Sequence, residues 1–278
     1  MNKSFVLNSN ICFFSKSCIF ASQNNRNMDE GIGKTIKLFL LWLGLFLVPP
    51  IIGAIIGRFF MNHANYEILK WAQLLGFVLI IIVFFGKRYV ELSFGRIERR
   101  MVWPVVGMSV LIAASQAFVL FSALSLLDVD LQFQGEELER RQRLVSGIAG
   151  ILNACIFAPI GEEIGFRGII LGGLLKTRCR PWIAILISAL IFALFHGFGT
   201  NFVTALLFGI LVGWLYWRTG SIIPGIIIHI VNNSLTAIDL SGQPNAIFWL
   251  IFVVSLLLLA YCLWWFGKSM CVQKDENH

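Results

Sequence analysis

The chain has 278 residues and a mass of 31.3 kDa, and 58% of its residues are hydrophobic, against about 45–50% in an ordinary soluble domain. Only 13% are charged, roughly half the usual share. These figures exclude soluble globular, disordered, collagen-like and coiled-coil classes. The net charge of +7 is not concentrated in a basic cluster, so no nucleic-acid partner is expected. Long runs rich in Leu, Ile and Phe favour helices over a membrane barrel, and predict an all-α polytopic membrane protein.

Residues 1–30 differ from the rest because they are polar and rich in Asn and Ser. Their weak apolar patch is interrupted by Lys16, so they do not resemble a signal peptide. We expect Met28 to be the natural start and the preceding 27 residues to be a disordered or mis-assigned extension.

About eight apolar segments follow, each near the length of about 20 residues that a membrane helix needs. Pro49 and Pro50 are expected to bend or end the first segment. The fourth is too long for one straight crossing, and the fifth and sixth are short enough to suggest tilted or partly buried helices. Gly209 and Gly213 in the sixth predict close helix packing. The segments are 36–60, 67–86, 101–126, 144–175, 182–197, 201–218, 221–240 and 247–267.

The charges of the connections predict the orientation of the chain. Lys and Arg gather in residues 86–100 and 176–181 and outside the first and last segments, whereas the links 198–200 and 241–246 carry no charge. The positive-inside rule then places both termini in the cytoplasm, and we expect the cell membrane as the location. After the extension, the expected parts are a three-helix region at 31–143, a region carrying chemistry at 144–240, and a last helix and tail at 241–278.

Two acids and a base interrupt the fourth segment, where charged groups are costly and therefore mark functional sites. Glu163 and Arg167 are four residues apart, so they share a helix face and are expected to pair. Glu162 lies about 100° around the helix from Glu163 and is left for another partner. Pro159 is expected to free backbone carbonyls one turn earlier. A purely structural ion pair is the alternative interpretation.

Two of the four histidines also lie in apolar segments. His196 ends the fifth segment, and His229 lies in the seventh together with Asn232, Asn233 and Asp239. Glu162 and His196 lie 17 residues before and after Cys179, at the turn that joins their two segments, so an antiparallel pair places them at similar depth. His229 and Asn233 fall in the same broad layer, which predicts one shared polar site.

This set of side chains suits hydrolysis. A glutamate beside a histidine can hold and deprotonate water, and a second histidine with an amide can stabilise an oxyanion. The alternative is a zinc site of Glu162, His196 and His229. Because an amide is a poor zinc ligand, Asn233 favours the metal-free interpretation, in which no cofactor is required. In that interpretation we expect Glu162 to lie closer to His196 than to His229.

Three motifs in order, Glu162-Glu163-x-x-x-Arg167, Phe192-x-x-x-His196 and His229-x-x-x-Asn233, resemble the CAAX protease and bacteriocin-processing (Abi) family of intramembrane proteases, which includes type II CAAX prenyl endopeptidases. The resemblance implies an eight-helix membrane fold and endopeptidase chemistry. It also implies that Glu162 and His196 activate water, that Arg167 braces the paired acids Glu162 and Glu163, and that His229 and Asn233 face the oxyanion.

The expected partners are the lipid bilayer and a membrane-associated protein or peptide substrate. One competing function is a non-proteolytic membrane immunity or scaffold protein that keeps the same fold. A second is a transporter that uses Glu162, Glu163 and His196 as a proton relay; the lack of duplicated, Gly/Pro-broken helices argues against it.

Overall fold

The computed structural model describes residues 28–61, 66–92, 95, 97–126, 146–177, 179–235 and 245–272, and within them the regular structure is helical. The all-α prediction is therefore confirmed. The expected extension at 1–27 lies outside the described residues. The elements are α1 (Met28–Met61), α2 (Tyr66–Gly86), η1 (Arg99–Met101), α3 (Val102–Leu126), α5 (Gly147–Leu152), η2 (Asn153–Phe157), α6 (Ala158–Glu163), η3 (Ile164–Leu171), α7 (Gly172–Leu175), α8 (Pro181–Phe195), α9 (Thr200–Thr219), α10 (Ile223–Leu235) and α11 (Asn245–Val272).

Five helical stretches of the described chain are long and apolar enough to cross a membrane, which makes this an integral multi-pass membrane protein. They are Gly31–Phe59, Tyr66–Gly86, Gly147–Leu175, Asn201–Thr219 and Trp249–Gly267. Three shorter apolar helical stretches, Val102–Ser115, Pro181–Phe195 and Ile223–Leu235, fall in the other expected segments. The number of eight spans stays a prediction.

Of the two alternatives at Pro49 and Pro50, a helix end is excluded, because both prolines lie inside α1, which continues to Met61. A bend there stays a prediction. For the seventh segment, α10 is described as far as Leu235, and the remaining expected residues, 236–240 with Asp239, lie outside the described residues.

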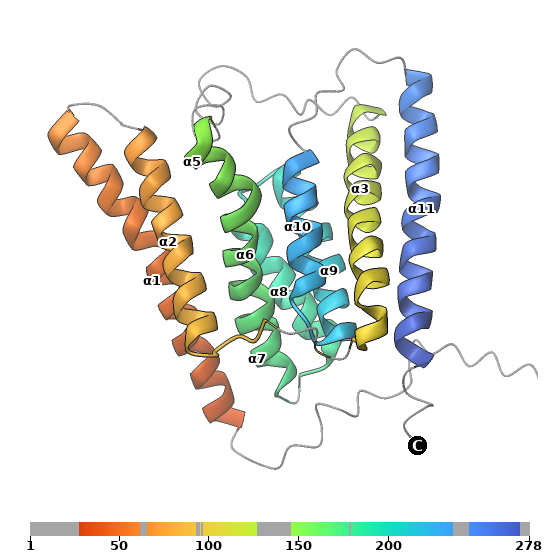
Figure 1. Ribbon diagram of the computed structural model, residues 1–278, viewed down its shortest axis with the longest axis horizontal. Coiled ribbons are helices and arrows are strands. Elements are labelled where there is room, and N and C mark those ends of the chain that lie inside the picture. Colours follow the sequence, from red (N-terminus) through yellow and green to blue (C-terminus); the bar gives the residue numbers. More distant parts are fainter. Residues whose placement is uncertain are drawn as a thin grey trace, which may run out of the picture.

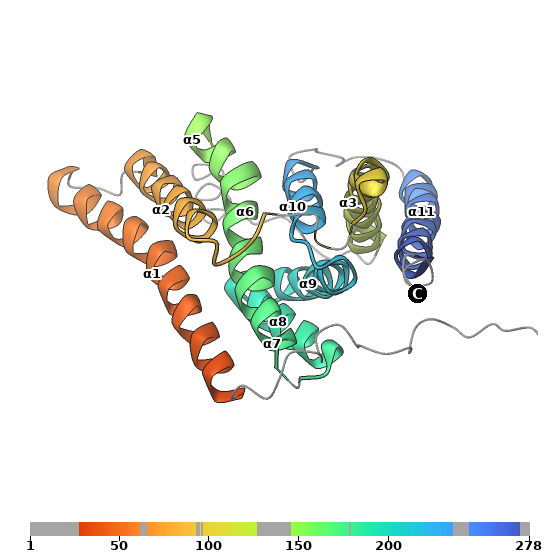
Figure 2. The ribbon, with the colours of Figure 1, turned by 60° about the horizontal axis from the view of Figure 1, so that its bottom comes forward.

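The helices stand side by side in one bundle (Figure 1). α1 packs against α2, α8 against α9, and α3 against both α10 and α11. Figure 2 shows α1 and α2 at one end of the bundle and α3 and α11 at the other, with the helices that carry the three motifs between them. The expected close packing of α9 is confirmed, because Gly209 and Gly213 face Ala189 and Ile185 of α8.

Residues 147–175 form one continuous helical body, here called the 147–175 helix, that alternates between α and π geometry. The segments Asn153–Phe157 and Ile164–Leu171 are π-helical. Such segments are rare and frequently occur at functional sites. Glu162 and Glu163 lie on the short α-helical stretch between them.

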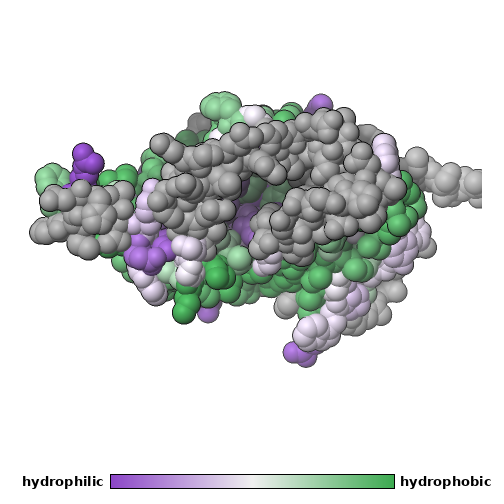
Figure 3. Space-filling view, turned by 90° about the horizontal axis from the view of Figure 1, so that it is seen from above, coloured by the Kyte–Doolittle hydropathy of each residue, from purple (hydrophilic) through white to green (hydrophobic). Residues whose placement is uncertain are grey.

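The surface agrees with burial in lipid. Large apolar side chains are exposed along α1, α8 and α11, among them Ile52, Leu194 and Leu257. In water such exposure would mark an interface, but in a bilayer it is what lipid contact requires. Viewed from above, a central hollow shows both hydrophilic and hydrophobic residues, and hydrophobic residues cover much of the described flank (Figure 3).

Candidate active site

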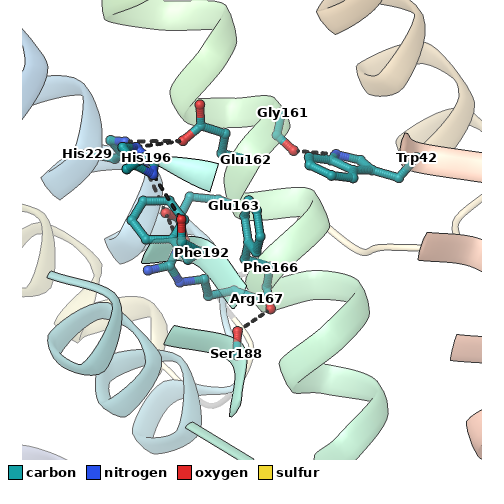
Figure 4. Close-up of polar contacts among 10 residues, drawn as sticks. All are labelled: Trp42, Gly161, Glu162, Glu163, Phe166, Arg167, Ser188, Phe192, His196 and His229. Carbon is teal, nitrogen blue, oxygen red and sulfur yellow. Dashed lines mark hydrogen bonds and ion pairs between the residues drawn. The ribbon is translucent and has the colours of Figure 1, made fainter. Parts of the chain in front are cut away.

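Three helical bodies bring five of the six predicted site residues together (Figure 4). The 147–175 helix supplies Glu162, Glu163 and Arg167, the end of α8 supplies His196, and α10 supplies His229. His196 caps the end of α8, where Gly197 and Gly199 with φ of 87° and 75° turn the chain into α9. Glycine adopts these left-handed angles without steric cost, so the turn leaves the imidazole at the helix end.

The inner part of the site is a buried network around Glu163. Its Oε1 accepts a hydrogen bond from Arg167 at 2.9 Å and lies 3.0 Å from His229 Nδ1. The Arg167 guanidinium also lies 4.6 Å from the ring centroid of Phe192. The predicted Glu163–Arg167 pair is therefore present. Glu163 also orients the imidazole of His229 through the contact with Nδ1.

The outer part is formed by Glu162 and the two imidazoles. Glu162 Oε2 lies 3.7 Å from His229 Nε2 and 3.9 Å from His196 Nε2. The side chains of His196 and Glu162 are 36% and 17% exposed, whereas that of Glu163 is fully buried. Of the two acids, Glu162 is the one that an incoming molecule can reach.

One expected detail of this geometry is wrong. Glu162 was expected to lie closer to His196 than to His229, but the shorter separation is to His229. The reason is that Glu163 fixes Nδ1 of His229, which turns its Nε2 toward Glu162. Both separations exceed a direct hydrogen bond and are wide enough for a bridging water.

The hydrogen-bond partners assign the tautomers of both rings. His196 Nδ1 lies 2.9 Å from the Phe192 carbonyl oxygen, which only accepts, so Nδ1 must carry the proton. Glu163 Oε1, already paired with Arg167, likewise accepts from His229 Nδ1. In the neutral rings both Nε2 atoms are therefore acceptors that face Glu162. Within the described residues, the buried Oε2 of Glu162 has no hydrogen-bond donor of its own.

Asn233, the sixth predicted residue, contacts the backbone of the 147–175 helix. Its Nδ2 donates to the carbonyl of Ala154 at 2.9 Å. In the π-helical segment the N–H of Ala158 bonds to Asn153, and the next residue, Pro159, has no N–H to offer Ala154. Pro159 thus frees a backbone carbonyl as expected, and the Asn233 amide satisfies it. The expected oxyanion role of Asn233 stays a prediction.

The residues of the zinc alternative lie at the same place. Nε2 lone pairs backed by hydrogen bonds at Nδ1 are what a metal would need. Tetrahedral zinc with ligands at 2.0–2.1 Å holds the ligand atoms about 3.3–3.4 Å apart, and Glu162 Oε2 lies 3.9 Å and 3.7 Å from Nε2 of His196 and His229. The metal-free interpretation stays a prediction. Among the described residues, no group of three or more His, Cys, Asp or Glu side chains is arranged to hold a metal ion.

Two side chains near the site were not predicted from the sequence. Trp42 of α1 donates from Nε1 to the Gly161 carbonyl at 2.8 Å, and Ser188 of α8 donates to the Phe166 carbonyl at 2.8 Å. The glycines at 161 and 165 signal that a neighbour approaches this helix closely. The sequence contains no sign of which distant residue does so.

Residues 144–235 match the family model of the type II CAAX prenyl endopeptidase Rce1-like proteins. The match includes all six predicted site residues and ends with α10, and it confirms the family resemblance drawn from the three motifs. No curated protein and no solved structure matches the chain.

Proposed function

We propose that this integral membrane protein, which carries an Rce1-like type II CAAX prenyl endopeptidase domain at residues 144–235, hydrolyses a peptide bond of a membrane-associated protein or peptide. The substrate is of the CAAX type or the bacteriocin type. The supporting observation is the partly exposed Glu162 side chain, whose Oε2 faces two imidazole Nε2 acceptors beside a buried, charge-paired Glu163.

In the proposed reaction a water molecule lies between Glu162 and His196. Glu162 takes one proton from this water, His196 Nε2 accepts a hydrogen bond from the other, and the oxygen attacks the peptide carbonyl. The proton held by Glu162 then passes to the leaving amine, and the other stays on the oxygen that attacked, so the products are a carboxylic acid and an amine.

His229 stabilises the oxyanion in this scheme. Since its Nδ1–H is committed to Glu163, Nε2 becomes a donor only when the ring carries both protons. The Glu163 carboxylate stabilises that imidazolium, as a buried acid does in a Ser-His-Asp triad. Asn233 assists by holding the Ala154 carbonyl of the 147–175 helix, and its side-chain amide is proposed to face the oxyanion beside His229.

The proposal is tested with purified protein in liposomes and two kinds of peptide, a prenylated CAAX peptide and an unprenylated apolar leader peptide. Glu162→Ala, His196→Ala and His229→Ala should each lower cleavage by at least about 10²–10⁴ without loss of membrane insertion, because each removes a group that acts on water or oxyanion. Glu91→Ala, at an exposed acid outside the domain, is the matched control. A scaffold protein would show no cleavage with any of these chains.

Metal dependence is measured on the same samples. If the reaction needs no metal, we expect the purified protein to contain less than stoichiometric zinc and to keep full activity after chelation and washing. Zinc bound stoichiometrically and lost in both His196→Ala and His229→Ala would contradict it.

A further inference from the structure

Trp42 of α1 is the largest side chain packed against the 147–175 helix beside Glu162, and it is fully buried. We propose that Trp42 is a positioning residue for Glu162: its indole N–H fixes the peptide unit that carries the catalytic carboxylate. The inference rests on the proposed role of Glu162, and it adds a functional part for the helix region that precedes the matched domain.

The hydrogen bond lies at the peptide group next to Glu162. Trp42 Nε1 donates to the carbonyl oxygen of Gly161 at 2.8 Å (Figure 4). The same carbonyl accepts the N–H of Ile164, the first residue of the π-helical segment. The bond therefore acts where the helix changes register, and a rotation of this peptide unit would move Glu162 relative to both imidazoles.

The ring has little freedom to move. Phe39 and Phe46 stack on Trp42 with ring centroids 5.4 Å and 5.1 Å away, and Phe166 meets it edge-on at 5.3 Å. On the helix side, Gly165 provides the space, because a Cβ there would lie 2.7–2.8 Å from Cζ2 and Nε1 of the indole. The indole ring of Trp42 thus fills the space that a larger side chain at Gly165 would take.

The polar atom of this side chain argues for more than packing. Tryptophan in membrane proteins concentrates at the lipid–water interface, where its N–H can reach polar groups. Trp42 is instead buried in the core, and its indole N–H donates to the backbone carbonyl of Gly161. Since Glu162 lies 3.7 Å and 3.9 Å from the two Nε2 atoms, a displacement of about 1 Å is enough to cost about 10²-fold in rate.

The first test is Trp42→Phe, which keeps an aromatic ring and removes the N–H. We expect kcat to fall about 10- to 100-fold with KM little changed, because substrate contacts are left intact. Trp103→Phe, at a residue that is 79% exposed on α3, is the matched control and should leave both constants unchanged. An unchanged kcat in Trp42→Phe, or a change in KM alone, would overturn the proposal.

The second test does not depend on activity. Gly165→Ala should lower the thermal unfolding midpoint in the natural chain, since the new methyl group meets the indole. In a Trp42→Leu background the same substitution should lower the unfolding midpoint much less, and this coupling would support the close contact between Gly165 and the indole. Equal decreases in both backgrounds would overturn it. Failure of the proposed function would appear separately, as no cleavage by the natural chain.

Discussion

Glu162 and Glu163 are adjacent in sequence, yet their surroundings assign them different tasks. Glu163 is fully buried between Arg167 and His229, whereas Glu162 is partly exposed and faces two imidazoles. Helical spacing was sufficient to predict this division, because residues four apart share a face and neighbours do not. The sequence did not reveal that Glu163 orients His229, since this contact joins residues 66 positions apart.

A prediction at this scale concerns the buried ion pair. Arg167→Met keeps the apolar contact with Phe192 but leaves Glu163 as an uncompensated buried charge. Removing one partner of such a pair costs about 3–5 kcal/mol, so we expect a loss of this size in the free energy of unfolding, measured by denaturant titration in micelles.

Two further variants separate charge burial from general damage. Arg58→Met, at an exposed residue in the last turn of α1, should change stability by less than about 1 kcal/mol. Glu163→Gln added to Arg167→Met should recover part of the loss, because the stranded charge is gone. A double variant that is less stable than Arg167→Met would argue against this reading of the pair.

At the scale of elements, the decisive feature is the changing register of the 147–175 helix. The sequence predicted that Pro159 frees a carbonyl, and the structure identifies it as that of Ala154, held by Asn233. The π geometry itself was not predictable from periodicity, because it depends on donors that three other helices supply. These donors are Trp42, Ser188 and Asn233.

The register makes a specific prediction for two substitutions. Asn233→Ala should lower stability by about 1–3 kcal/mol, the cost of leaving the partly buried Ala154 carbonyl unsatisfied. Pro159→Ala restores an N–H at the position that faces Ala154 in π geometry, so the double variant should be more stable than the sum of the two single changes implies. Thermal unfolding in micelles measures both.

The neighbouring amide provides the control for that pair. Asn232→Ala should be mild in stability and in cleavage, and Pro159→Ala should not compensate for it. If Asn232→Ala were the severe change, the choice of Asn233 as the functional amide would be wrong.

At the scale of the whole molecule, hydropathy was sufficient to predict the membrane class and most helix bounds, since long apolar segments leave few alternatives to helices. The arithmetic of depth also placed Glu162, His196 and His229 in one layer, and these residues do meet. Which atoms face one another was beyond the sequence, because this depends on helix rotation and on the buried anchor Glu163.

Orientation in the bilayer is the prediction that belongs to this scale. Reporter fusions after residues 90, 178 and 272 should be cytoplasmic and one after residue 135 should be external, because Lys and Arg gather on the first set of connections. A cytoplasmic signal at residue 135 would contradict both the orientation and the number of spans.

The central claim is that the Glu162 carboxylate activates water for peptide hydrolysis. The most direct measurement compares binding and cleavage of one membrane-associated peptide by the natural protein and by Glu162→Gln in liposomes, with products identified by mass spectrometry. Glutamine keeps the shape of the side chain but cannot take a proton. We expect the variant to bind the peptide with unchanged affinity and its cleavage rate to fall about 10²–10⁴-fold. Cleavage by Glu162→Gln at the natural rate would contradict it.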